Sequence, residues 1–432
     1  MKKSLLLALW ILCLALPSLA QKEYGLKFSS LVSDDLTLEN AIRLGLENNS
    51  DFLTAQQEII IAEQKVNEAK FRYLPQFALQ GTATWFNLDY PMVLSDSVAN
   101  RFLPGKMLNN DNRFYAVGVT ATQYLYSGGR IHGTLKAARA NLKQVQTRYE
   151  TVKNQVVLTI KQAFAQLLYA QENAALTEDI YQKAISWNKN NTDVWTQIQN
   201  RSALAQLENA SSIAKNELTK ARLAMLVSLN KELNSPLSIS GTFSPTTLEG
   251  DLAHYNLWAT EFRPELKSAI YELELDNISI DLALSKRYPD IILNASYEKL
   301  GTQNLEDVNK QISLAVRLPI PYNFSEQITQ KRAEQKKSEL KRALMEDNIR
   351  TQVALSFENM TFWQQEALNR QQTYQDLTSL FEKASKNASK SGTAPLQAAL
   401  AYLHAAQDYL VAVKENHIAK AQLEWAIGKD IE

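Results

Sequence analysis

The sequence predicts a mainly α-helical protein that is built from a duplicated unit and carries four strands of a membrane β-barrel. Residues 134–235 and 322–391 contain neither Gly nor Pro, so we expect helices much longer than the usual three turns. Apolar patterns recur at fixed displacements along the chain, which is typical of a duplication. Four short segments alternate apolar and polar residues instead, which is typical of strands.

The composition excludes several classes of protein. The chain has 432 residues with 46 basic and 46 acidic side chains, so its formal net charge is zero. A protein that binds nucleic acid would be expected to carry an excess of basic residues, so no nucleic-acid partner is predicted. The 13 Gly and 11 Pro are too few for a loop-rich all-β chain, and the 45% hydrophobic content is too high for a disordered one.

The N-terminal segment has the features of a secretory signal peptide. Two lysines precede an apolar run at residues 5–16, and small residues lead to an expected cleavage site after Ala20. We therefore expect residues 1–20 to be removed on export, together with the single cysteine, Cys13. A lipid anchor on Cys13 is the alternative, although the preceding residue, Leu12, is larger than acylation signals favour.

Two copies of one unit are predicted from displaced patterns. A coiled-coil seam, in which apolar residues stand three and four apart, begins at Leu204 and recurs from Leu396, a displacement of 192 residues. A second pattern begins at Ala55 and recurs from Ala269, a displacement of 214 residues. The predicted parts are a first structural repeat at 37–235, a linker at 236–250 and a second structural repeat at 251–428.

Strands are predicted at 77–88, 114–126, 290–299 and 310–319, and a long loop at 89–112 separates the first two. Lengths of about 9 to 11 residues with period-two alternation match transmembrane barrel strands. No apolar run after the signal segment approaches the roughly 18 to 20 residues of a spanning helix, so a membrane crossing would require a β-barrel. The polar positions expected to face the lumen are Gln80, Thr82, Thr84, Asn294, Ser296, Gln311, Ser313 and Arg317.

Four strands cannot close a barrel, and an open sheet edge in lipid is very costly. Three chains would supply about twelve strands, which is enough for a water-filled bore. The long helices would then continue the bore as a tube beside the membrane. A soluble periplasmic coiled-coil scaffold, whose strands cover its own helices, is the alternative.

The order of several short segments around the duplication resembles the TolC-like outer-membrane efflux protein family, over nearly the whole length after the signal segment. The matching segments are Leu36-Thr37-Leu38-Glu39-Asn40-Ala41, Leu74-Pro75, Leu125-Tyr126-Ser127-Gly128-Gly129-Arg130, Tyr288-Pro289, Ser391-Gly392-Thr393-Ala394-Pro395-Leu396 and Ala426-Ile427-Gly428. No single segment is specific, and it is their order that carries the resemblance.

The resemblance implies a homotrimer with a 12-stranded β-barrel in outer-membrane lipid and a periplasmic α-helical barrel. Such proteins are the exit ducts of tripartite systems, joined through a periplasmic adaptor, or membrane fusion protein, to an inner-membrane pump of the RND or ABC type. The implied function is export of drugs or other small molecules, and a duct for type I protein secretion is the alternative. Because the pump supplies the energy, no enzymatic activity, cofactor, metal site or catalytic residue is expected.

The expected periplasmic tip differs from that of better-known members, which carry a tyrosine, an arginine and rings of aspartate. The aligned positions, together with those of an adaptor-contact pattern, define a candidate tip or gate that comprises Asn200, Arg201, Gln206, Ser389, Gly392, Thr393, Ala394, Ala398 and Ala401. A salt-bridged latch is therefore not predicted. We expect closure to depend on close helix packing near Ala394–Ala401 instead.

Overall fold

The computed structural model describes residues 36–85, 113–187, 193–301, 306–320, 322–387 and 394–431, so the predicted signal peptide and the 89–112 loop lie outside the described residues. The first series of elements is α2 (Leu38–Asn48), α3 (Ser50–Phe71), β1 (Gln76–Trp85), β2 (Arg113–Ser127), α5 (Arg130–Trp187) and α6 (Val194–Ser228). The second series is α7 (Leu252–Phe262), α8 (Pro264–Ser285), β3 (Asp290–Gly301), β4 (Glu306–Arg317), α9 (Phe324–Asn387) and α10 (Ala394–Ile427).

Corresponding elements of the two series have nearly equal lengths. Helices α2 and α7 have 11 residues each, α3 and α8 have 22 each, and α6 and α10 have 35 and 34. This order is what a duplicated unit would produce, and the division into two repeats with a linker at 236–250 stays a proposal. No helix within the described ranges is long and apolar enough to cross a membrane.

The four strands form one antiparallel sheet in the order β1-β2-β3-β4. They overlap the four predicted strand ranges, but β4 begins at Glu306, four residues before its predicted start at 310. There the pairs Leu300↔Asp307 and Gly301↔Glu306 continue the ladder of the β3–β4 hairpin. Backbone pairing across a hairpin does not require apolar side chains, so the alternation pattern ends before the strand does.

The register divides the side chains of the sheet into two faces. One face is apolar and exposed in the single chain, and Ile312 is 81% exposed on it. Its large members are Phe77, Leu79, Val117, Val119, Leu293, Tyr297, Val308, Ile312, Leu314 and Val316. Water is a poor solvent for such a face, because removing apolar surface from water is favourable by about 25 cal/mol per Å².

The other face of the sheet is polar. The paired sets Gln80↔Gly118↔Glu298 and Thr122↔Asn294↔Ser313 define it. By register, all eight residues predicted to line the lumen lie on this one face. The sheet therefore separates apolar from polar side chains, and the role of the polar set as a lumen lining stays a prediction.

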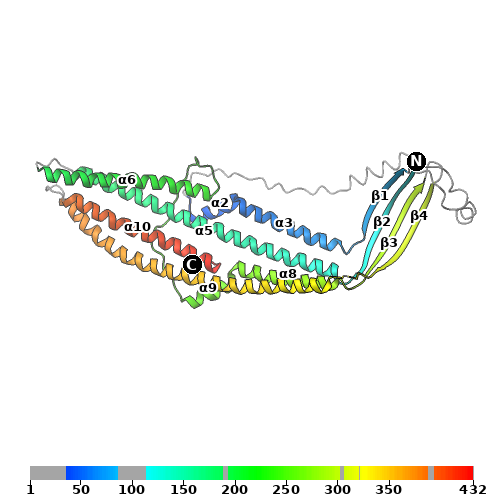
Figure 1. Ribbon diagram of the computed structural model, residues 1–432. Coiled ribbons are helices and arrows are strands. Elements are labelled where there is room, and N and C mark those ends of the chain that lie inside the picture. The colour runs from blue at the N-terminus through cyan, green and yellow to red at the C-terminus, as the bar shows by residue number, and fades with distance from the viewer. Residues whose placement is uncertain are drawn as a thin grey trace, which may run out of the picture.

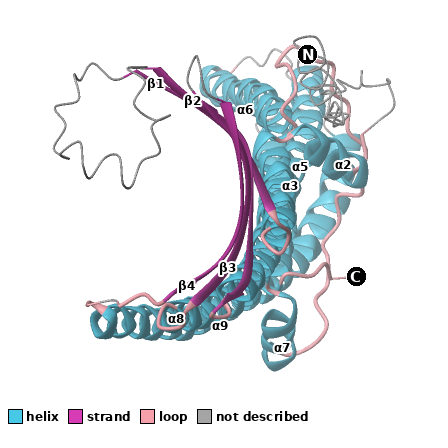
Figure 2. Ribbon diagram, turned by 90° about the vertical axis from the view of Figure 1, so that its right-hand side faces the viewer, coloured by secondary structure: helices cyan, strands magenta, loops and turns pink. Residues whose placement is uncertain are grey.

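The molecule is elongated, with the sheet at one end (Figure 1). Helices α5, of 58 residues, and α9, of 64 residues, run from the sheet toward the opposite end, where they pair with α6 and α10. Viewed along the long axis from the sheet end in Figure 2, the strands and the long helices form a single curved wall. Helices α2 and α7 and the C-terminal end lie on the convex side of this wall.

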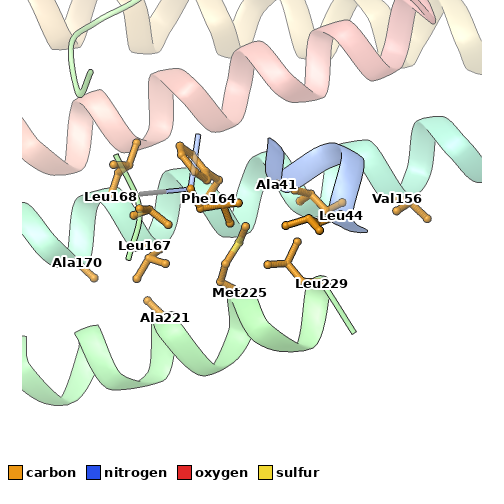
Figure 3. Packing of buried hydrophobic residues seen from close by; sticks show 13 residues of the cluster. Ala41, Leu44, Val156, Phe164, Leu167, Leu168, Ala170, Ala221, Met225 and Leu229 are labelled. Carbon is orange, nitrogen blue, oxygen red and sulfur yellow. The ribbon is translucent and has the colours of Figure 1, made fainter. Parts of the chain in front are cut away.

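The largest core lies at mid-length, where α2 packs against α5 and the end of α6. Phe164, Met225 and Leu229 lie at its centre (Figure 3). Gly45 of α2 permits the close approach, because a Cβ at this position would lie 2.2 Å from Ile160 Cδ1. This packing fixes the short helix α2 on the long helix α5.

A buried arginine performs the corresponding task in the second series. Arg263 is 3% exposed and precedes α8. Its guanidinium donates to the Ala426 carbonyl at 2.8 Å, to Gln352 at 2.9 Å and to Glu265 at 2.9 Å, and it lies over the ring of Trp425. Because guanidinium donors point in fixed directions, one side chain ties the start of α8 to both α9 and α10.

The segment at 229–251, which we call the belt, carries the chain from α6 to α7 across the last helix. Thr246 donates its N–H and its hydroxyl to Asn416 Oδ1, at 2.7 and 2.8 Å, and its carbonyl accepts from Asn416 Nδ2 at 3.1 Å. Phe243 stacks on the ring of His417, with the ring centroids 5.9 Å apart. The belt is thus fastened to α10 by two adjacent side chains.

His417 is held in its neutral form. Burial lowers the pKa of this imidazole, and the positive charge of Lys420 adds to the effect, while a hydrogen bond with the Ser244 backbone opposes it. His417 Nε2 is buried without a hydrogen-bond partner among the described residues. A proton on this nitrogen would therefore place an uncompensated charge beneath the belt.

We expect acidification to loosen the belt. The free imidazole titrates near about 6.5 and the folded pKa is lower, so the unfolded state binds more protons between these two values. Stability is therefore full above about pH 6.5 and falls as the pH drops toward the folded pKa. Hydrogen exchange of amides 240–246, corrected for intrinsic rates, should be faster at about pH 5 than at about pH 7, and His417→Gln should remove the difference. Equal protection at both pH values would contradict this role of His417.

Candidate duct wall and tip

The residues predicted to act in transport lie at the two ends of the elongated molecule. The eight predicted lumen residues lie on the sheet, and the described members of the candidate tip lie where α6 begins and α10 begins. The wall between them is formed by α5 and α9. The two groups are therefore ends of one wall and do not converge on a single pocket.

The junction between strand β2 and helix α5 is a tight turn. Gly128 and Gly129 adopt φ values of 59° and 82°, in the left-handed region that glycine alone enters at little cost. A Cβ at Gly128 would also lie 2.8 Å from the Ser285 carbonyl oxygen. The segment that the sequence marked as a strand-to-helix turn thus requires its first glycine for both conformation and space.

An ion pair joins the two halves of the chain at this junction. Arg130, in the first turn of α5, donates to the carboxylate of Asp290, which begins β3. The Asp290 side chain is 10% exposed, and Asp290 pairs with Arg317 in the strand register. Sequence reasoning placed Arg317 in the lumen set but missed Asp290. Asp290 and its ion partner Arg130 are 160 positions apart, so no local pattern marks them. The Arg130 side chain is 30% exposed, so removal of one partner leaves the other only partly desolvated and costs less than the loss of a fully buried pair.

The candidate tip residues have varied surroundings. Asn200 is 5% exposed, and its Oδ1 has no hydrogen-bond partner among the described residues. Gln206 Nε2 donates to Ser202 Oγ at 3.5 Å, and Arg201 is exposed. Ser389, Gly392 and Thr393 lie outside the described residues. The set is therefore only partly described, and its gating role stays a prediction.

The packing near the start of α10 is carried by neighbours of the predicted alanines. Ala394 and Ala401 are exposed and Ala398 is half-buried, whereas Leu396 and Ala399 are almost fully buried. These two belong to a core that joins four helices. Its main members are Ile180 and Ala184 of α5, Ala203 and Leu207 of α6, Phe381 of α9, and Leu396, Ala399 and Leu403 of α10.

A column of five aromatic rings, which we call the aromatic column, overlaps this core and fastens α9 to α10 and α5. Its ring centroids are 5.5 Å apart for Trp187–Phe381, 4.3 Å for Phe381–Tyr402, 5.8 Å for Tyr402–Tyr374 and 5.2 Å for Tyr374–Tyr409. Tyr402 also donates its hydroxyl to the Tyr374 hydroxyl at 3.3 Å. Burial and this hydrogen bond raise the pKa of Tyr374 to about 12, so the ring stays neutral. Sequence reasoning missed the column, although its rings recur seven residues apart on both α9 and α10.

Removing the central ring should free the helix ends. Phe381→Ala deletes a side chain that is 7% exposed, stacked on Tyr402 and in tilted contact with Trp187, which typically costs about 3 to 5 kcal/mol. We expect faster hydrogen exchange in the part of α9 that follows Tyr374 and in the part of α10 that precedes Tyr402. Exchange near the sheet should change little. Phe362→Ala on the same helix is the matched control, because Phe362 is 54% exposed. Similar exchange rates for both variants would contradict a fastening role for the column.

Among the described residues, no group of three or more His, Cys, Asp or Glu side chains lies in an arrangement that could hold a metal ion. A cavity of about 710 Å³ is lined mainly by α5, α8 and the end of α10, away from the sheet and the tip. The arrangement of the predicted site residues is therefore that of a wall.

Comparison with known proteins identifies the fold. Residues 41–186 match the family described as outer membrane efflux protein, and no curated protein matches. The Campylobacter jejuni CmeC outer membrane channel is similar over 90% of this chain and 85% of its own, with a TM-score of 0.73 and 15% identity. The open state of the Neisseria gonorrhoeae MtrE outer membrane channel is similar over 91% and 89%, also with a TM-score of 0.73 and 15% identity.

The Vibrio cholerae outer membrane protein VceC is similar over 91% of this chain and 97% of its own, with a TM-score of 0.72 and 15% identity. The resemblance predicted from the sequence is therefore confirmed: residues 41–186 match the outer membrane efflux protein family, and the chain has the fold of solved outer-membrane channels.

Proposed function

We propose that this chain is one third of a trimeric exit duct in the outer membrane of a Gram-negative cell, and that the duct exports drugs or other small molecules. The observation that carries the proposal is the two-faced sheet at the end of a curved helical wall. One face suits lipid and the other suits water. The matched family and the similar channels support the same function.

The edges of the sheet argue for more than one copy. Among the described strands, β1 and β4 are the outer strands, and each has one side without a partner strand. Unpaired backbone groups in lipid cost several kcal/mol each, so the edges must pair with other copies. Three copies supply about twelve strands, which close around a water-filled bore.

The helical wall has corresponding free flanks. The helix contacts run α3–α5, α5–α8 and α8–α9, which leaves α3 and α9 at the two margins of the wall. Ile61 of α3 and Leu340, Leu344 and Leu355 of α9 are each more than half exposed in the single chain. Burial of such side chains against a neighbouring copy contributes about 1.5 to 3 kcal/mol each. Margin-to-margin association would extend the wall into a closed tube.

In this proposal the duct is passive and non-enzymatic. An inner-membrane pump of the RND or ABC type would supply the energy and connect through a periplasmic adaptor, and the N-terminal signal peptide would direct export. Type I protein secretion is the second candidate cargo, since a wide bore serves both. A soluble periplasmic scaffold is disfavoured by the apolar face, because such a scaffold would leave that face in water.

Adjacent residues of β4 provide a matched test. Leu314 lies on the apolar face and is 62% exposed, whereas Ser313 lies on the polar face. We expect Leu314→Lys to block membrane assembly, because a lysine facing the bilayer midplane costs about 2 to 4 kcal/mol per copy. Ser313→Lys should assemble normally and shift the ion selectivity of reconstituted channels toward anions.

Two measurements decide between the outcomes, namely the recovery of trimers from outer membranes and the reversal potential in planar bilayers. The proposal requires that the two variants differ. A folded monomer that remains in solution without detergent, or equal tolerance of lysine on both faces, would refute it.

A further inference from the structure

A groove on the convex side of the wall carries more positive charge than its acidic neighbours neutralise. The groove has a volume of about 710 Å³ and runs along the line where α5 meets α8, closed at one end by the turn after α10. Five lysines and three carboxylates line it. We call it the lysine groove. Its lysines are Lys143, Lys153, Lys161, Lys267 and Lys429, and its acids are Glu150, Glu424 and Asp430.

The three carboxylates of the groove already have ion partners within the chain. Lys161 holds both Glu424, at 2.7 Å, and Asp430, at 2.5 Å. Lys153 lies 3.7 Å from Glu150. These pairs occupy two of the five lysines, so no acidic side chain lining the groove is left to neutralise the other three.

The remaining lysines, Lys143, Lys267 and Lys429, form no ion pair with any described carboxylate, and all three are exposed. Aromatic rings hold two of them over the groove. The Lys143 ammonium lies 5.5 Å from the ring centre of Tyr271, and the Lys429 ammonium lies 4.1 Å from that of Trp258 and 5.3 Å from that of Phe262. Cation–π contacts restrict an ammonium group without neutralising its charge.

The position of the groove decides which molecules reach it. Residues of the α7 end and of the C-terminal turn line the groove, and both lie on the convex side of the wall in Figure 2. The meeting line of α5 and α8 is also internal to one chain, whereas α3 and α9 form its margins. Copies that join at their margins therefore leave the groove open, on the outside of the tube and away from the transported cargo.

We propose that the lysine groove is a docking site for an acidic peptide segment of a partner outside the duct. Three lysines without an ion partner among the described residues, two of them beside aromatic rings, and a net excess of two positive charges in the groove lining suit an extended ligand with several carboxylates, since each carboxylate gains a charge partner and the backbone can lie on the rings. The inference rests on the proposed function only in placing the groove outside a tube.

The test uses the full-length trimer purified in non-ionic detergent and a fluorescein-labelled oligoglutamate peptide. Fluorescence anisotropy at physiological salt measures binding, and an oligoglutamine peptide of the same length reports binding that is independent of charge. We expect saturable binding of oligoglutamate alone. The variant Lys143→Gln/Lys267→Gln/Lys429→Gln should weaken that binding about tenfold, because three exposed charge pairs are lost.

The matched control is Lys65→Gln/Lys136→Gln/Lys220→Gln, which removes the same charge from exposed lysines of α3, α5 and α6 that do not line the groove. This control should bind oligoglutamate as the unmodified trimer does. Equal weakening in both triple variants, or no binding to the unmodified trimer, would overturn the proposal. Trimer recovery and channel conductance, measured on the same samples, report separately on the duct.

A second measurement does not depend on the variants. Photo-crosslinking of a benzophenone-labelled oligoglutamate to the unmodified trimer, followed by peptide mass spectrometry, should place the crosslinks in residues 143–161, 264–271 and 425–430. Crosslinks spread over the whole convex surface, or concentrated at the tip, would also overturn the proposal.

Discussion

A sheet with one apolar and one polar face cannot be satisfied by a single solvent, and this constraint governs the whole molecule. The apolar face is exposed in the single chain, and the polar face carries amide, hydroxyl and charged groups that need water or each other. A boundary between lipid and water satisfies both faces, but only when the sheet edges are paired. Four strands alone cannot meet that condition, and this is the physical basis for the proposed association of copies.

The rest of the fold holds this sheet at the end of a long wall. The Gly128 turn redirects the chain from strand to helix within a few residues, and the Arg130–Asp290 ion pair ties the first half of the chain to the second at the same level. At mid-length, Arg263 and the belt fasten the short helices to the long ones. At the far end, the aromatic column joins α9 to α10 and α5. The ion pair, Arg263, the belt and the aromatic column each connect segments that are distant in sequence. These contacts hold the elongated wall together.

Local patterns predicted much of this architecture. The absence of Gly and Pro over 134–235 predicted long helices, and the described part of that range holds most of α5 and all of α6. Period-two alternation placed the four strands and assigned all eight polar residues to one face. The same alternation missed the start of β4, where Val308 is the one apolar residue among the first four but the backbone ladder continues. Periodicity reports which side chains are buried, and it says little where a strand is held by its backbone alone.

Long-range contacts could not be read from these patterns. Asp290 pairs with Arg130, and Lys161 pairs with Glu424, across 160 and 263 positions. No local spacing marks such partners, because they meet only once the helices have packed. The aromatic column is an intermediate case, since its seven-residue spacing was visible on α9 and on α10 while the match between the helices was not. The alanines predicted at the tip show the same limit, because burial fell on Leu396 and Ala399 beside them.

The most direct test of the two-solvent sheet is a spin-label scan of β1 in reconstituted bilayers. Single cysteines at 77–83 would each carry a nitroxide, and its relaxation would be measured with oxygen, which partitions into lipid, and with a water-soluble nickel complex. We predict accessibilities that alternate with period two and opposite phase, with the lipid maxima at Phe77 and Leu79 and the water maxima at Gln80 and Thr82. Uniform access of the nickel complex to every position would contradict the account.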